Sequence, residues 1–206
     1  MGIQLSEREM SILKFINEFG FCEVSHIMQR FNLGRSTCYE QMKVLRRFEM
    51  LNHAEVLPNY PGVYYLTVKA ARLLDTDLPY FSQVPRNAYV HHMAVLRTYL
   101  KVKTEYPACE WITERRLIRQ KYEDMPGSKE HLPDGIVILT DGSWIAIEVE
   151  LTMKARQRLI TILSDYAVDK SFSEVWYFCS PHIMAAITEA ALSFPKIKTY
   201  LVEINS

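Results

Sequence analysis

The sequence predicts an α+β protein built from two domains. Residues 1–75 show three helical patterns followed by a β-prone hairpin, while the later part alternates short β-prone runs with amphipathic helical stretches. The chain has 206 residues, of which 49% are hydrophobic and 23% charged, so it is long enough to bury two ordinary cores. We therefore expect domains at 1–75 and 90–206, joined by a linker at 76–89.

Composition limits the classes of partner and compartment. Lys+Arg and Asp+Glu each number 24, so any nucleic-acid surface must be a local patch. The cysteines Cys22, Cys38, Cys109 and Cys179 form no CxxC pair, which disfavours a zinc ribbon and a disulfide framework. The sequence has neither an apolar run of about 18 residues nor a signal-peptide pattern. We therefore expect a cytoplasmic protein with no membrane partner.

The first domain begins with three helical patterns. Ser6 is a candidate N-cap with Glu9 three residues later, and the apolar stripe that follows ends at Gly20. "CEVSHIMQRF" predicts a second helix, and the stretch from Ser36 through "TCYEQMKVLRRFEML" predicts a third, with Gly34 in the turn between them. "LNHAEVLPNYPGVYYLT" then predicts a hairpin around a Pro-Asn-Tyr-Pro-Gly turn. Three helices followed by a hairpin is the order of a winged helix-turn-helix.

The third predicted helix carries the candidate DNA-binding residues. In a helix-turn-helix, residues near the start of the recognition helix face base edges, while basic residues anchor phosphates. We expect double-stranded DNA as the partner, with this helix in the major groove and the hairpin tip, Tyr60 to Gly62, against the backbone. The alternative is a solvated amphipathic helix in a domain used for protein contact. The candidates are Arg35, Ser36, Thr37, Tyr39, Gln41, Lys43, Arg46 and Arg47.

The second domain follows a proline-containing stretch without sustained periodicity, the expected linker. A helix is predicted from His91 to Tyr106, then a strand in "CEWIT" that runs into a basic stretch. "PDGIVIL" and "WIAIEVELT" predict an antiparallel hairpin. A helix from Lys154 to about Asp169, the strand "EVWYFCS", the helix "PHIMAAITEAALS" and the strand "IKTYLVEI" complete the order α-β-β-β-α-β-α-β.

Three carboxylates stand on this predicted hairpin. Glu148 and Glu150 share one face of a strand, because side chains alternate with a period of two, and strand pairing can bring Asp134 beside them. Oxygen ligands of this kind suit Mg²⁺ or Mn²⁺. His131, three residues before Asp134, is a further candidate for a metal or phosphate contact. The alternative is a salt-bridge network of the two glutamates with Lys154, Arg156 or Arg158.

The element order, with Pro-Asp opening one strand and Glu-x-Glu closing the next, resembles the PD-(D/E)XK nuclease-like fold. By that resemblance, Asp134 matches the motif aspartate and Glu148 the motif glutamate, while Glu150 stands where lysine is usual. The resemblance implies a metal site of Asp134, Glu148 and Glu150. If the domain is nuclease-active, these residues are catalytic together with Lys154, which would stabilise developing charge.

Both halves together resemble the replication-relaxation family of plasmids and conjugative elements, through "LTVKAARLL", "WITERRL" and "HLPDGIVIL" followed by "IAIEVELTMKARQRLITILSDY". The resemblance implies a DNA-binding accessory or regulatory protein of a mobile element, acting in replication, mobilisation or transcriptional control. It also implies a relaxase or replication protein as a partner, and winged-helix readers commonly bind as homodimers. The alternatives are a metal-dependent endonuclease or nickase targeted by its winged helix, and a protein-interaction adaptor.

Overall fold

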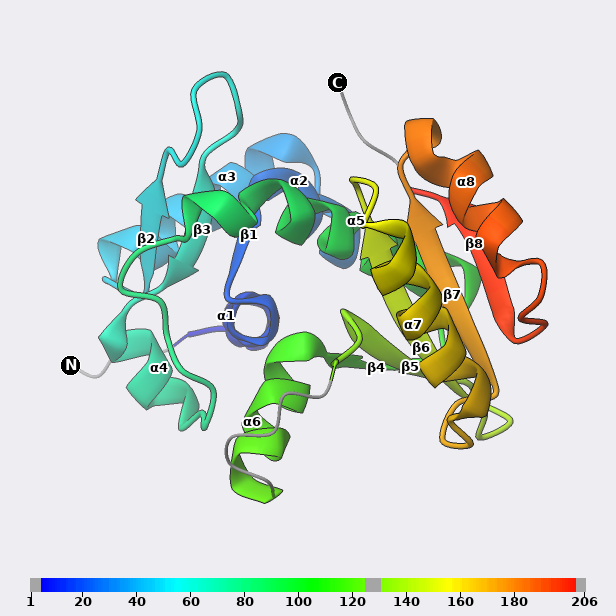
Figure 1. Ribbon diagram of the computed structural model, residues 1–206. Coiled ribbons are helices and arrows are strands. Elements are labelled where there is room, and N and C mark those ends of the chain that lie inside the picture. The colour runs from blue at the N-terminus through cyan, green and yellow to red at the C-terminus, as the bar shows by residue number, and fades with distance from the viewer. Residues whose placement is uncertain (1–4, 125–130, 203–206) are drawn as a thin grey trace. The chain divides into compact units, whose positions relative to one another are not determined.

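The computed structural model describes residues 5–124 and 131–202 (Figure 1). The chain divides into two compact units, Met1–Leu96 and Arg97–Ser206. The elements of the first unit are α1 (Glu7–Phe19), β1 (Phe21–Glu23), α2 (Val24–Phe31), α3 (Arg35–Arg47), β2 (Leu51–Ala54), β3 (Val63–Leu66), α4 (Val68–Leu74), the 3₁₀ turn η1 (Arg86–Ala88) and the start of α5 (Tyr89–Glu105).

The first unit has winged helix-turn-helix topology. Its strands pair antiparallel in the order β1-β3-β2, and α2 and α3 are the paired helices of the motif. The predicted capping box of α1 is present, because the Glu9 amide donates to Ser6 Oγ over 3.3 Å and the Ser6 amide donates to Glu9 Oε2 over 2.7 Å. Gly20 ends α1 with a φ of 89°, which favours glycine.

Two details of the first unit differ from the expectation. β1 is absent from the predicted elements, since a strand of three residues is too short to show alternation, and α2 therefore starts at Val24 and not at Cys22. The expected linker also carries side chains buried within the first unit, including Leu78, Val84 and Tyr89. Prolines indicate irregular backbone, but they do not exclude packing. The division between the units falls later, inside α5.

The second unit is a mixed α/β layer structure. Its further elements are β4 (Glu110–Thr113), α6 (Glu114–Asp124), β5 (Gly135–Ile138), β6 (Trp144–Glu150), α7 (Arg156–Val168), β7 (Glu174–Cys179), α8 (Pro181–Ala191) and β8 (Ile197–Leu201). The sheet order is β4-β5-β6-β7-β8, antiparallel up to β6 and parallel from β6 to β8. Each parallel step is made through a crossover helix, α7 and then α8.

One buried core cluster of the second unit lies between the sheet and these crossover helices. Ala146, Val175 and Tyr177 on the strands form one buried cluster with Leu159 and Leu163 of α7 and with apolar side chains of α8. Burial of one such Leu or Val side chain stabilises the fold by roughly 1.5–3 kcal/mol. Packing in this cluster therefore turns one face of β6 towards the crossover helices. That face carries Ala146, Glu148 and Glu150.

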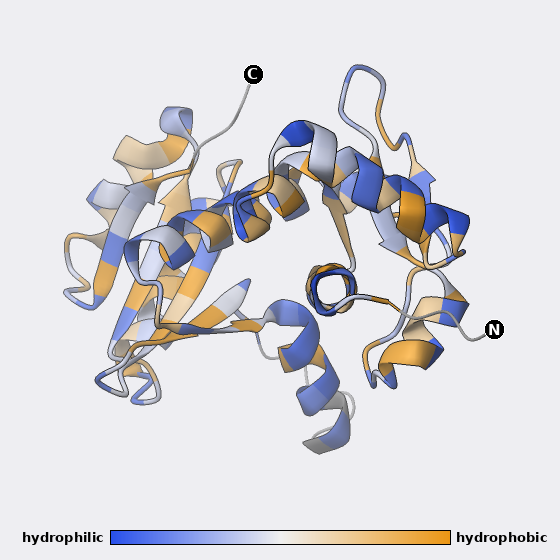
Figure 2. Ribbon diagram, turned by 180° about the vertical axis from the view of Figure 1, so that it is seen from behind, coloured by the Kyte–Doolittle hydropathy of each residue, from blue (hydrophilic) through white to orange (hydrophobic). Residues whose placement is uncertain are grey.

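The helix α6 corrects the predicted order of the second domain. The segment after β4 was expected only as a basic stretch, but Glu114–Asp124 is helical. Figure 2 shows this helix mostly in the blue of hydrophilic residues, and its apolar residues Leu117 and Ile118 are too few to reveal a helical period from the sequence. The end of the predicted last strand, Glu203 and Ile204, lies outside the described residues.

Candidate functional site

The helix α3 has one buried face and one polar exposed face. Cys38, Met42 and Leu45 are buried and hold the helix against the first unit. Seven of the predicted DNA-binding side chains are exposed: Arg35, Ser36, Thr37, Tyr39, Lys43, Arg46 and Arg47. The guanidinium of Arg35 lies over the ring of Tyr39, 5.7 Å from its centroid. The exposed face therefore carries hydrogen-bonding groups near its start and cations towards its end.

Gln41 differs from the other candidates. Its side chain is only half-exposed, and its Oε1 atom is buried with no hydrogen-bond partner among the residues that the structure describes. A buried acceptor without a donor is unfavourable by about 1–3 kcal/mol. Gln41 thus lies at the edge of the exposed face and not at its centre.

A groove of 710 Å³ lies between α3 and the strands β2 and β3. Four predicted residues line it from α3, namely Tyr39, Lys43, Arg46 and Arg47. Its other lining residues are Glu40, Glu49, Leu51, Asn52, His53, Tyr64 and Thr67. The sheet side was not predicted, because the hairpin sequence carries no Lys or Arg that would indicate a phosphate contact.

His53 lines the groove from β2. Its ring lies against that of Tyr64, with centroids 4.8 Å apart. Burial and the nearby Arg46 charge lower the pKa of His53, and Glu55 partly opposes this. A Cβ at position 62 would lie 2.2 Å from His53 Nε2, so Gly62 gives the imidazole its space.

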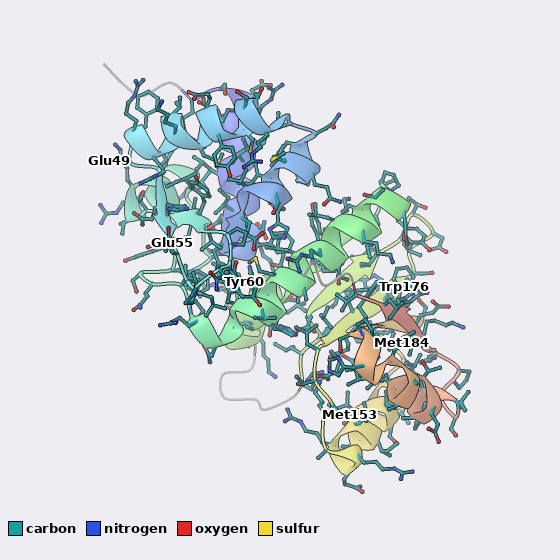
Figure 3. The ribbon with its side chains drawn as sticks, turned by 90° about the horizontal axis from the view of Figure 1, so that it is seen from above. Glu49, Glu55, Tyr60, Met153, Trp176 and Met184 are labelled. Atoms are coloured by element: carbon teal, nitrogen blue, oxygen red, sulfur yellow. The ribbon has the colours of Figure 1, made fainter. Side chains whose placement is uncertain are left out.

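The hairpin tip packs onto the start of α5. The ring of Tyr60 meets that of Tyr89 edge to face at 5.6 Å, and the Tyr89 hydroxyl lies 3.1 Å from the Pro61 carbonyl oxygen. Figure 3 shows Tyr60 beside the first turns of α5. Tyr60 nevertheless remains 48% exposed, so the tip keeps a free surface.

In the second unit, strand pairing brings Asp134 next to Glu148. The Asp134 amide donates to the Ile147 carbonyl oxygen over 2.9 Å, and the Val149 amide donates to Asp134 Oδ2 over 2.7 Å. Glu148 is buried on β6 between these contacts. The predicted proximity of these two carboxylates is therefore present.

Glu148 is held by two side chains. Its Oε1 atom lies 2.7 Å from His131 Nε2 and accepts a hydrogen bond from the Tyr166 hydroxyl of α7. Burial raises the pKa of the Glu148 carboxyl, while hydrogen bonds from His131 and Tyr166 oppose that rise. The bond to Glu148 raises the pKa of His131.

Glu150 has a different partner from Glu148. Its Oε2 atom accepts a hydrogen bond from Lys154 Nζ, which is the ion pair that the salt-bridge alternative contains. Within residues 5–124 and 131–202, no group of three or more His, Cys, Asp or Glu side chains could hold a metal ion. The three carboxylates thus do not converge on one point as these side chains are placed, although Asp134 and Glu148 do lie together.

Two tyrosines of this cluster were not identified from the sequence. Tyr166 belongs to the apolar stripe of α7 and resembles a core residue. Tyr177 pairs in register with Glu148 on the neighbouring strand, and burial raises its pKa. Its hydroxyl is buried without a hydrogen-bond partner in the described part of the chain. No spacing signal could reveal either residue, because each faces the glutamate from another element.

Comparisons with known proteins find only distant similarity. No protein-family model matches the chain, and no curated protein matches it. A structure of a ZitR mutant from Lactococcus lactis is 16% identical and covers 60% of this chain and 73% of that one, with a TM-score of 0.33. Another ZitR mutant, in complex with DNA, is 15% identical over 59% and 73% of the two chains, with a TM-score of 0.33.

PigF with SAH aligns over more of the chain but less closely. It is 12% identical and covers 96% of this chain and 57% of that one, with a TM-score of 0.25. Similarities at this level assign no family, so the fold is defined here by its own topology. In the part of the chain that the structure describes, no helix is long and apolar enough to span a membrane.

Proposed function

We propose that the protein is a DNA-binding regulator that places α3 in the major groove of double-stranded DNA. The observation that carries this proposal is the exposed face of α3, which presents Arg35, Ser36 and Thr37 at its start within a winged helix-turn-helix. A recognition helix reads base edges with the residues at its N-terminal end. Sequence preference is therefore assigned to this first turn.

Affinity is assigned to the cations further along the same helix. Lys43, Arg46 and Arg47 are exposed and line the groove beside β2. Lys and Arg contacts to phosphates release counterions and provide most of the sequence-independent affinity of such proteins. Because the net charge of the whole chain is +0, we assign the electrostatic attraction to DNA to this local cluster.

The first experiment is fluorescence anisotropy of a labelled random-sequence duplex titrated with the full chain at several salt concentrations. We expect the logarithm of affinity to fall linearly with the logarithm of salt concentration, as it does when phosphates are neutralised. An adaptor that has no nucleic-acid contact would show no salt-dependent affinity. That result would refute the proposed DNA binding.

We extend the proposal to the biological role of the protein. The sequence resemblance to the replication-relaxation family supports an accessory of a mobile element, acting in replication, mobilisation or transcriptional control. A homodimer would present two α3 helices to two half-sites one helical turn apart. A relaxase or replication protein would be the protein partner in that setting, and selection of bound duplexes from a random pool would test for a two-fold repeated site.

A second candidate function is a Mg²⁺- or Mn²⁺-dependent DNA endonuclease targeted by the winged helix. The adjacency of Asp134 and Glu148 on paired chain segments favours it. The ion pair of Glu150 with Lys154 weighs against a three-carboxylate metal site, so we assign no catalytic step.

The test of this second candidate is calorimetric titration of Mn²⁺ into the wild-type chain and into Glu148→Ala. Binding that the substitution removes would support a metal site. Cleavage assays on supercoiled, linear and single-stranded DNA would then test the activity. Absence of Mn²⁺ binding in both proteins, with all three DNA substrates intact, would eliminate the endonuclease.

A further inference from the structure

The groove beside α3 has a polar sheet wall as well as a cationic helix wall. Lys43, Arg46 and Arg47 line it from α3, while Asn52 and His53 line it from β2. The two walls therefore present hydrogen-bond donors towards one space of 710 Å³. A concave surface with cations on one side and neutral donors on the other suits an anion that is too large for one side chain.

The lining of the groove contains fewer carboxylates than cations. Glu49 lies in an ion pair with Lys69, with 3.1 Å between Oε2 and Nζ. Glu40 is the other carboxylate among the lining residues. Three cations of α3, Lys43, Arg46 and Arg47, stand against these two glutamates in the lining. The local charge of the groove is therefore positive.

His53 has charged and aromatic neighbours on several elements. Arg46 faces it from α3, Tyr64 from β3, and Glu55 from the segment after β2. Gly62, just before β3, carries no Cβ and so leaves space for the ring. The imidazole is exposed, with Arg46 as its cationic neighbour.

We propose that this groove seats a phosphodiester of the DNA backbone, with Arg46 donating to it from α3 and His53 donating to it from β2. The inference rests on the proposed function and deepens it, since it extends the interface from the recognition helix onto the sheet. It also makes DNA binding depend on pH. In the free protein, burial and Arg46 favour the neutral imidazole, whereas a phosphate beside it favours the imidazolium.

The sign of the pH dependence follows from this difference. Because the pKa of His53 is lowered in the free protein and is raised by the bound phosphate, binding takes up a proton from the buffer. Affinity must then rise as pH falls through the interval between the two pKa values. One proton bound per complex sets an upper limit of about tenfold in affinity per pH unit.

The test compares duplex affinity of the full chain at about pH 6 and about pH 8, at one fixed salt concentration. We expect the wild type to bind roughly threefold to tenfold more tightly at the lower pH. His53→Gln keeps a hydrogen-bonding side chain but cannot titrate, so it should lose most of that difference. His182→Gln removes an exposed histidine of α8 and is the matched control, expected to keep the wild-type pH dependence.

An NMR titration of the His53 ring keeps the inference testable if His53→Gln folds poorly. Inorganic phosphate and the duplex should each raise the titration midpoint of His53. A midpoint that moves with phosphate but not with the duplex would assign the groove to a free anion and overturn the backbone contact. A midpoint that moves with neither, while the duplex still binds, would overturn the inference and leave DNA binding intact. Absence of any salt-dependent duplex binding would overturn both.

Discussion

The hydroxyl of Tyr89 lies 2.8 Å from Oε1 of Glu23, and both side chains are buried within the first unit. Glu23 ends β1 and precedes α2, while Tyr89 begins α5. The same hydroxyl lies 3.1 Å from the Pro61 carbonyl oxygen at the hairpin tip. One phenol thus connects three segments of the winged helix that are far apart in sequence.

Tyr89→Phe should lower the free energy of unfolding of the first unit by roughly 1–3 kcal/mol, because the buried Glu23 carboxylate loses a hydrogen bond. Urea denaturation followed by circular dichroism would measure the change. Tyr65→Phe is the control, since no hydrogen bond of its hydroxyl is found among the described residues, and it should change stability by less than about 0.5 kcal/mol. Equal effects of both substitutions would argue against a special role for the Tyr89 hydroxyl.

Tyr166→Phe and Tyr177→Phe should have opposite effects on the second unit. The Tyr166 hydroxyl donates to the buried Glu148, so its loss should destabilise by about 1–3 kcal/mol. The Tyr177 hydroxyl is buried with no partner in the described residues, so its removal should be neutral or stabilising. Thermal melting of the two variants compares them directly, and a larger loss for Tyr177→Phe would contradict the described hydrogen bonding.

Gly62→Ala should displace the His53 ring. The added Cβ would lie 2.2 Å from His53 Nε2 and 3.3 Å from the Ala54 carbonyl oxygen, so the imidazole must move or the hairpin must shift. We expect a loss of about 1–3 kcal/mol in stability and changed chemical shifts of the His53 ring.

Gly34→Ser is the matched control for this substitution. No atom lies within 4 Å of the Cβ that would be added at position 34. Its φ of −64° and ψ of 150° also suit a serine N-cap of α3. It should therefore be neutral or stabilising. An unchanged His53 spectrum in Gly62→Ala would contradict the close approach.

The sequence predicts the helices of the first unit well because their signals are local. Ser6, Glu9 and Gly20 mark the ends of α1, and apolar stripes mark the buried faces of α1 and α3. β1 and α6 escape prediction for the opposite reason, since β1 is too short for alternation and α6 has too few apolar residues to mark a period. Local patterns thus identify elements that bury a regular face.

The candidate sites are less accessible to prediction because they depend on tertiary contacts. The pairing of Asp134 with Glu148 follows from strand alternation and hairpin geometry. The ion pair of Glu150 with Lys154 was part of the salt-bridge alternative, whereas the Tyr166 hydroxyl that donates to Glu148 depends on how α7 packs on β6. His53 carries no sequence signal of its own, because its role as a groove residue depends on its closeness to Arg46.

DNA binding through α3 is tested most directly by the salt dependence of duplex affinity in Arg46→Ala/Arg47→Ala. The control is Arg156→Ala/Arg158→Ala, which removes the same charge from exposed positions of α7. The slope of log affinity against log salt is negative, and loss of two phosphate contacts should reduce its magnitude by about two units. The double variant should also bind more weakly at every salt concentration, while the control keeps the wild-type slope. Identical slopes and affinities for the two double variants would contradict the placement of α3 on DNA.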